Sequence, residues 1–171
     1  MNLAVVLSGG TGTRMGLGIP KQYQVIADRP VIVHTLEQFE RFPEVGGVVA
    51  VASPEWEGRI LEWKSIYGLS KLRKIAPAGP DRQQSIRNGL IAAKPFMEGG
   101  TGGVIIQDAA RPLTSQDLLF RLIDGLGEAP AVMPVLPITD TTYTSRDGQW
   151  VDGLLDRSTL YAGQAPEAFD Y

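Results

Sequence analysis

The chain has 171 residues, which fits one domain, since domains usually hold roughly 100–200 residues. It contains no cysteine, so disulfide scaffolds, thiolate metal sites and cysteine nucleophiles are excluded. Its single histidine argues against a metal site built from several histidines. The formal net charge of −3 argues against a general nucleic-acid binder. The sequence shows neither a signal-peptide pattern nor an apolar stretch of membrane-spanning length. We therefore expect a cytoplasmic protein that binds neither nucleic acid nor membrane.

Strands and helices are predicted to alternate along the chain. Residues 3–7 form a continuous apolar run that ends at two glycines, as expected of a strand buried on both faces. The further predicted elements are a helix over 31–39, a strand over 48–52, a helix over 54–67, a strand over 72–76, a helix over 82–93 capped by Asp81, a strand over 104–106, a helix from Ser115 to 126, and a strand over 131–135. This order predicts a single α/β domain over 1–171, Rossmann-like, with a mainly parallel sheet flanked by helices.

The stretch at about 138–157 departs from this alternation. Residues 141–145 and 150–154 read as short strands on either side of Arg146-Asp147-Gly148-Gln149, whose Asp-Gly pair suits a type I′ turn. We predict an inserted β-hairpin arm. Because an isolated two-stranded ribbon is marginally stable in water, the arm is expected to lie against a second subunit or against its own domain.

A glycine-rich loop follows the first strand. Its sequence is Leu7-Ser8-Gly9-Gly10-Thr11-Gly12-Thr13-Arg14-Met15-Gly16, and Pro20-Lys21-Gln22 comes shortly after it. Glycines let backbone N–H groups approach an anion closely, which predicts a phosphate cradle. The spacing fits neither a Walker A loop nor a dinucleotide fingerprint, which disfavours an NAD(P)-dependent oxidoreductase. The alternative is a solvent-facing turn with two surface charges, Arg14 and Lys21.

Three further motifs follow the loop in a fixed order. They are Gly79-x-x-Arg82-x-x-Ser85, Asp108-Ala-Ala-Arg111-Pro112, and Asp140-Thr141 followed by Asp156-Arg157. Together with the glycine-rich loop, they make essentially the whole chain resemble the cytidylyltransferases that form CDP-polyols. This group includes the enzymes acting on 2-C-methyl-D-erythritol 4-phosphate and the similar enzymes acting on ribitol 5-phosphate.

The resemblance implies a nucleotide-diphospho-sugar transferase type of fold and transfer of CMP from CTP to a polyol phosphate, with release of pyrophosphate. It implies catalytic roles for Arg14, Lys21 and Arg157, which would stabilise charge on phosphates. The residues implied to bind the nucleotide are Leu7, Ser8, Gly9, Gly10, Gly12, Gly79, Arg82, Ser85, Asp108 and Ala109.

The resemblance also implies a magnesium ion, bound mainly through the CTP phosphates and contacted by Asp108. The polyol phosphate would be bound by Asp108, Arg111, Thr141 and Arg157, the last two reaching it through an arm exchanged in a homodimer. The alternative interpretation of Asp108 is a helix-capping or turn acid, but its place in one block with Arg111 and Pro112 favours a functional role. Arg157 is equally compatible with a surface ion pair to Asp156, which contributes little stability.

Three residues depart from the pattern of this group, mostly on the polyol side. Gln107 stands where a histidine is common, Tyr143 replaces a basic residue, and Ala165 lacks a hydroxyl expected near the polyol phosphate. The group also usually continues beyond this length with a helix, strands and a substrate-binding lysine, so we expect weak or no turnover from these residues alone.

Three interpretations of function follow. The Asp-Ala-Ala-Arg-Pro block favours 2-C-methyl-D-erythritol 4-phosphate, and thus isoprenoid precursor synthesis, as the first choice. Residues 32–39 and 160–164 look closer to the ribitol 5-phosphate branch, which is the alternative. A non-catalytic nucleotide-binding module is the alternative of another class.

Overall fold

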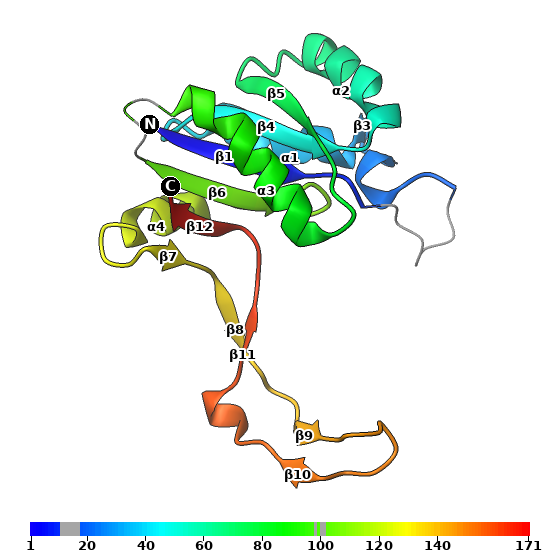
Figure 1. Cartoon of the computed structure of the whole chain (residues 1–171), viewed down its shortest axis with the longest axis vertical. Coiled ribbons are helices and arrows are strands. Elements are labelled where there is room, and N and C mark those ends of the chain that lie inside the picture. Colours follow the sequence, from blue (N-terminus) through cyan, green and yellow to red (C-terminus); the bar gives the residue numbers. More distant parts are fainter. Residues whose placement is uncertain (11–17, 98, 100–101) are drawn as a thin grey trace.

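A six-stranded sheet lies at the centre of the computed structural model, which describes residues 1–10, 18–97, 99 and 102–171. Its strand order is β5-β4-β1-β6-β12-β7 (Figure 1). The strands are β1 (Asn2–Leu7), β4 (Val45–Ala52), β5 (Leu72–Pro77), β6 (Gly103–Asp108), β7 (Ala131–Val132) and β12 (Glu167–Asp170). Four of them, β5, β4, β1 and β6, are parallel neighbours, while β12 and β7 pair antiparallel. The predicted mainly parallel sheet is confirmed.

The register brings the carboxyl ends of the parallel strands to one edge. Leu7 at the end of β1 pairs with Val51 of β4 and with Asp108 of β6. Leu3 to Val6 are buried on both faces of the sheet, as the continuous apolar run predicts. Residues that follow these strand ends, although far apart in sequence, are therefore neighbours in space.

Helices cover both faces of the sheet. On one face lie α1 (Val31–Arg41), α2 (Pro54–Ile66) and α4 (Gln116–Gly125), and on the other lies α3 (Arg82–Ala93) (Figure 1). The caps predicted from sequence are present: Asp81 accepts the Gln84 N–H at 2.7 Å, and Ser115 accepts the Leu118 N–H at 3.2 Å. Within the described ranges, no helix combines the length and apolar character that a membrane span requires.

Short elements connect the larger ones. A hairpin of β2 (Val25–Ile26) and β3 (Arg29–Pro30) precedes α1, and a 3-10 turn η2 (Lys21–Tyr23) precedes that hairpin. A second 3-10 turn, η3 (Lys94–Phe96), follows α3. The turn η2 packs against the start of the glycine-rich loop through hydrogen bonds from Gln22 and Tyr23.

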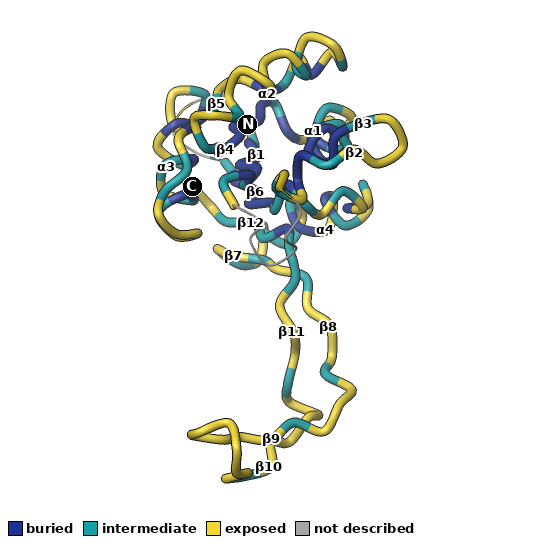
Figure 2. The backbone as a smooth tube through the Cα atoms, turned by 90° about the vertical axis from the view of Figure 1, so that its right-hand side faces the viewer, coloured by how far each residue is buried: buried dark blue, intermediate teal, exposed yellow. Residues whose placement is uncertain are grey.

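The arm is present and extends away from the rest of the chain (Figures 1 and 2). Its stem pairs β8 (Val135–Pro137) with β11 (Tyr161–Gly163), and its tip pairs β9 (Tyr143–Thr144) with β10 (Gly153–Leu154). A 3-10 turn, η5 (Arg157–Thr159), leads back from the tip to the stem. The ribbon is mostly exposed along its length (Figure 2). The arm therefore packs little against its own domain.

Two details of the predicted arm region are wrong. The strand predicted over 131–135 is divided into β7 and β8, which belong to different sheets, because Pro134 between them has no N–H to continue a ladder. The arm consequently includes its β8–β11 stem and begins before residue 138. The tip turn is also not of type I′. A type I′ turn needs a positive φ at both central residues, but only Gly148 of the pair has one, at +74°, while the φ of Asp147 is not positive. Instead, the Asp147 carboxylate accepts the N–H groups of Gln149 and Trp150.

Candidate functional site

A cleft of about 1000 Å³ opens at the carboxyl ends of the parallel strands. Leu7 ends β1 and Asp108 ends β6, while Ser53 and Ala78 directly follow β4 and β5, and all four residues line the cleft. Ligands of open α/β sheets bind in this position. The volume is adequate for a nucleotide, since ligand pockets commonly hold about 300–1,000 Å³. This cleft is the candidate active site.

The start of the glycine-rich loop forms one wall of the cleft. Gly9 and Gly10 line it, and Ser8 ties the loop to β4 because its N–H and its Oγ both donate to the Val51 carbonyl at 2.8 Å. Lys21 lines the same cleft from η2 and is exposed. A cation and a glycine backbone therefore face one space, which is the arrangement that phosphate groups require.

Two arginines flank the carboxylate of Asp108. Arg111 Nε lies 3.3 Å from Asp108 Oδ2, and Arg82 Nε lies 3.9 Å from Asp108 Oδ1. Each guanidinium group has a second partner near the C-terminal strand. Arg82 pairs with Glu167 of β12 at 3.3 Å, and Arg111 Nη1 donates to Oε1 of Gln164, which precedes β12, at 3.1 Å. Both arginine side chains are 49% exposed. They are positioned at the cleft yet accessible to an anion, and the planar guanidinium group suits phosphate.

One carboxylate of the cleft, that of Asp108, is placed where it could contact a metal ion. The described part of the chain has no group of three or more His, Cys, Asp or Glu side chains that could hold a metal alone. Asp108 lines the cleft with a carboxylate that caps no helix, whereas Asp81 is engaged as the cap of α3. Because a divalent ion such as Mg²⁺ commonly uses one or two carboxylates together with substrate phosphates and water, Asp108, which lies between Arg82 and Arg111, is the cleft residue that could hold one.

Most of the predicted site residues meet in this cleft. Its lining includes Leu7, Gly9, Gly10, Lys21, Gly79, Arg82, Ser85, Asp108 and Arg111. Ser8 and Ala109 are buried just behind the lining, where the Ala109 N–H donates to the Leu7 carbonyl at 2.9 Å. Ala110, rather than Ala109, faces the cleft. Gly12 and Arg14, for which roles were also predicted, lie outside the described residues.

Thr141 and Arg157 do not lie in the cleft of their own chain. Both belong to the arm, and Arg157 Nη1 donates to the Thr139 carbonyl at 2.9 Å. The alternative ion pair between Arg157 and Asp156 is absent from the pairs formed by the described residues. Asp156 instead accepts hydrogen bonds from Ser158.

Sequence reasoning assigned no ligand-binding role to several residues that line the cleft. Ser53 directly precedes α2 and Pro54 is its first residue, Pro80 and Asp81 precede α3, and Gln22 follows the lysine of η2. Positions just after buried parallel strands are a usable signal for such residues, since those strand ends meet at one edge. Gln22 belongs to the Pro20-Lys21-Gln22 stretch that follows the glycine-rich loop, but a role was predicted for the lysine alone.

Gln107 supports the loop that carries Arg111. Its side chain is buried, and Nε2 donates to the Arg111 carbonyl at 2.9 Å and to Thr114 Oγ1 at 3.2 Å. A glutamine in place of the commonly found histidine therefore has a structural function here. It fixes the path of the chain after β6.

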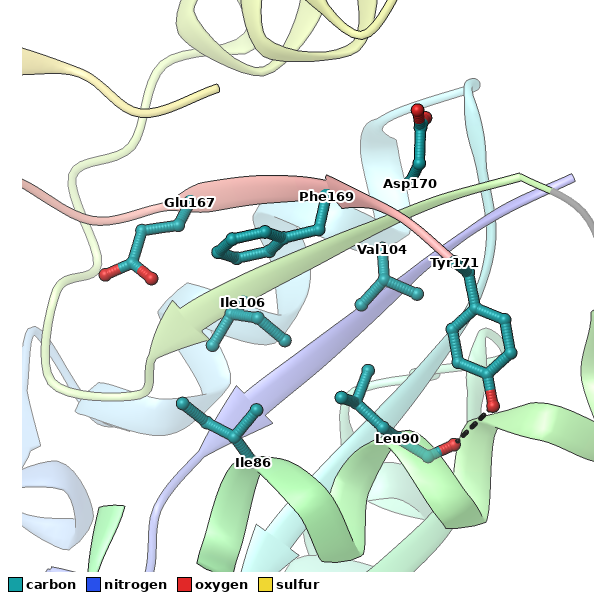
Figure 3. Close-up of a pocket in the computed structure, with 8 residues that line it drawn as sticks. All are labelled: Ile86, Leu90, Val104, Ile106, Glu167, Phe169, Asp170 and Tyr171. Carbon is teal, nitrogen blue, oxygen red and sulfur yellow. Dashed lines mark hydrogen bonds between the residues drawn. The ribbon is translucent and has the colours of Figure 1, made fainter. Parts of the chain in front are cut away.

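A second hollow, an apolar groove of about 390 Å³, lies between α3 and β12 (Figure 3). Its lining is Ile86, Leu90, Val104, Ile106, Glu167, Phe169, Asp170 and Tyr171. Figure 3 shows the aliphatic side chains of α3 and β6 facing Phe169, with the Tyr171 hydroxyl donating to the Leu90 carbonyl at 3.2 Å. The groove lining contains no Lys or Arg side chain, so the larger cleft remains the candidate for a phosphorylated ligand.

The fold and the cleft together define an α/β protein of the nucleotidyltransferase type. Comparison with known proteins gives the particular family. The model of the family described as 2-C-methyl-D-erythritol 4-phosphate cytidylyltransferase matches residues 2–171, and the chain belongs to this family.

Individual relatives agree with that assignment. The chain is 39% identical over 172 residues to a protein of Ruegeria sp. named bifunctional enzyme IspD/IspF, covering 100% of this chain and 43% of the relative. It is 34% identical over 169 residues to a 2-C-methyl-D-erythritol 4-phosphate cytidylyltransferase of Cereibacter sphaeroides, covering 98% of this chain and 72% of the relative. The chain thus spans less than half the length of the bifunctional relative.

A solved structure confirms the fold. The crystal structure of 4-diphosphocytidyl-2C-methyl-D-erythritol synthase from Anaerococcus prevotii superposes with a TM-score of 0.83 at 26% identity, covering 99% of this chain and 70% of that one. The expected Rossmann-like sheet flanked by helices is confirmed by this likeness.

Proposed function

We propose that this chain transfers CMP from CTP to 2-C-methyl-D-erythritol 4-phosphate and releases pyrophosphate. The observation that carries the proposal is the meeting of the start of the glycine-rich loop, Lys21 and the Arg82–Asp108–Arg111 cluster in one cleft. The names of the relatives support this polyol phosphate over ribitol 5-phosphate, the alternative drawn from the sequence. We propose that residues 1–171 act as one nucleotidyltransferase domain with an arm.

The reaction requires positioning and charge stabilisation more than proton transfer. A phosphate oxygen of the polyol phosphate attacks the α-phosphorus of CTP. The bond from that phosphorus to the bridging oxygen breaks, and pyrophosphate leaves with the electron pair. Because the phosphate dianion is already a nucleophile, no general base is needed. In this scheme, Lys21 and the backbone of residues 8–10 bind the triphosphate and stabilise its developing charge.

The other lining residues have complementary tasks in this scheme. Gly79 and Ser85, joined by a 2.9 Å hydrogen bond from the Gly79 N–H to Ser85 Oγ, would border the base and the ribose. Arg82 and Arg111 would hold phosphate groups by guanidinium hydrogen bonds. Magnesium, when bound through the CTP phosphates, would supply charge neutralisation at the leaving pyrophosphate, and Asp108 is the residue that would hold it.

We further propose a homodimer in which each arm reaches the cleft of the partner subunit. The support is the exposure of large apolar side chains on the arm: Trp150 is 75% exposed and Leu154 is 67% exposed. A two-stranded ribbon of this kind is marginal in water without a packing partner. The partners of the chain are then CTP, the polyol phosphate and a second copy of itself, and the location we propose is the cytoplasm.

Pyrophosphate release tests the proposed reaction. The chain is assayed with CTP and Mg²⁺ together with 2-C-methyl-D-erythritol 4-phosphate or ribitol 5-phosphate, alone and fused to the C-terminal segment of the Cereibacter sphaeroides relative. We expect release with the first polyol phosphate, faster in the fused chain. Release with ribitol 5-phosphate alone would show that this polyol phosphate, and not the first one, is the substrate. Tight CTP binding with no release from either chain would instead favour a non-catalytic nucleotide-binding module.

Replacement of Lys21 tests the role of the cleft cation. We expect Lys21→Ala to lower turnover by about 10²–10³, as for loss of one donor that stabilises charge in a transition state. Because the Lys21 side chain is exposed, the fold should be retained. Lys94→Ala, an exposed lysine of η3, is the matched control and should turn over normally. Unchanged turnover in Lys21→Ala would remove this lysine from the mechanism.

A further inference from the structure

Gln22 makes two buried contacts to the loop that lines the cleft. Its side chain is only 4% exposed, and Nε2 donates to the carbonyl of Ser8 and to the carbonyl of Gly10, both at 2.7 Å. One carboxamide therefore holds both ends of the stretch 8–10. These residues are the described part of the glycine-rich loop beyond β1.

Tyr23 adds a second donor to the same stretch. Its hydroxyl donates to the Ser8 carbonyl at 2.9 Å. Its ring stacks on Trp56 of α2 with centroids 3.9 Å apart and planes 17° apart, so the hydroxyl is held in place. Burial raises the pKa of Tyr23. The hydroxyl therefore keeps its proton, and remains a donor, at neutral pH.

These contacts fix the direction of a backbone donor in the cleft wall. In a planar trans peptide group, the C=O and the following N–H point in opposite directions. Because the Ser8 carbonyl is bound by Gln22 and Tyr23, the N–H of Gly9 is directed away from η2. Gly9 itself lines the cleft.

The same contacts also place Lys21. Lys21 and Gln22 are successive residues of η2, and the turn is closed by the Tyr23 N–H, which donates to the Pro20 carbonyl at 2.9 Å. Holding Gln22 to residues 8–10 thus fixes the backbone of Lys21 relative to the loop. The cation and the glycine backbone become one preorganised unit, which is the condition under which such groups bind phosphate well.

We propose that Gln22 is a positioning residue for polyphosphate binding, which orients the peptide groups of residues 8–10 and sets their place relative to Lys21. The inference rests on the proposed function where it names CTP as the ligand. The geometry itself concerns any polyphosphate chain that enters the cleft. A purely structural role would instead affect all ligands of the cleft equally.

The test measures three ligands by calorimetry: tripolyphosphate, CTP and cytidine. The variant is Gln22→Met, which keeps the length of the side chain and removes both donors. We expect the affinities for tripolyphosphate and CTP to fall about tenfold or more, because two hydrogen bonds are lost and each is worth up to about tenfold. The affinity for cytidine should not change. Gln24→Met is the matched control, since Gln24 is two positions further on and donates to the Ile19 carbonyl outside the cleft.

Tyr23→Phe provides a second variant that keeps the stacked ring and removes one donor to Ser8. It should reproduce the same ligand pattern with a smaller loss, about threefold, which keeps the test decisive if Gln22→Met does not fold. An equal loss for all three ligands, or no loss in either variant, would overturn the positioning role. Wild-type protein that binds tripolyphosphate but not CTP would overturn the proposed function alone. Wild-type protein that binds neither would overturn both.

Discussion

At the residue scale, two adjacent glycines of the cleft wall have different packing constraints. A Cβ added at Gly9 would overlap the Cβ of Ala78, whereas a Cβ at Gly10 would have nothing within 4 Å. Gly9 therefore permits the loop to lie close to the end of β5, and Gly10 is not needed for that approach.

This contrast predicts different outcomes for the same substitution. Gly9→Ala should destabilise the protein by about 1–3 kcal/mol, because an extra atom in a filled space forces a backbone shift, and it should weaken CTP binding as the loop moves. Gly10→Ala should leave stability unchanged or raise it by up to about 1 kcal/mol. Urea unfolding of the two variants measures the difference. Equal midpoints would show that the chain after β5 yields to the new methyl group at no cost.

The residues of the cleft differ in how far the sequence alone could identify them. Gly9, Lys21, Arg82 and Asp108 stand in short motifs with a chemical reason for their composition, and all four line the cleft. The pairs that hold the arginines could not be predicted from spacing. Arg82 meets Glu167, and Arg111 meets Gln164, across 85 and 53 positions of sequence. Only the antiparallel return of β12 beside β6 brings them together.

At the element scale, α3 couples the core to the cleft. Its first residue, Arg82, lies in the cleft, and Gly89 packs onto the sheet, where a Cβ would overlap Val5 Cγ1 and lie 2.9 Å from Val51 Cγ2. Gly58 in α2 is also an interior helical glycine, but its added Cβ would have nothing within 4 Å. The two helices therefore tolerate a methyl group differently.

The same substitution in these two helices should move stability in opposite directions. Gly89→Ala should cost about 1–3 kcal/mol of unfolding free energy, since the helix must move away from β1 and β4. Gly58→Ala should add about 0.5–1 kcal/mol, since alanine is the better helix former. Chemical denaturation followed by circular dichroism checks both. A stabilised Gly89→Ala variant would mean that α3 does not rely on this close contact.

Elements with a strong local pattern were predictable, and elements defined by distant partners were not. The helices α3 and α4 begin at the caps expected from Asp81 and Ser115. The strand β12 was not predicted, because its four residues acquire their strand character from pairing with β6 and β7. The tip of the arm was predicted as a tight turn, but the Asp147 carboxylate organises a longer loop. Side-chain hydrogen bonds to the backbone thus determined the turn more than the Asp-Gly pair did.

At the scale of the whole molecule, the arm separates residues that the proposed reaction needs in one place. Arg157 lies on the arm, and the cleft of the same chain contains Lys21. The arm projects from the sheet (Figures 1 and 2), and it exposes the large apolar side chains of Trp150 and Leu154. If arms are exchanged in a two-fold dimer, each complete site combines the cleft of one protomer with the arm of its partner.

Mixing two inactive variants tests this arrangement directly. Lys21→Ala disables the cleft and keeps the arm, while Arg157→Ala disables the arm and keeps the cleft. After unfolding and refolding together in equal amounts, about a quarter of all sites should pair an intact cleft with an intact arm, and turnover should return to that share of wild type. Arms that act on their own cleft would give no recovery, because every site would then carry one of the two lesions. Sedimentation of each variant as a dimer is the control that assembly itself is intact.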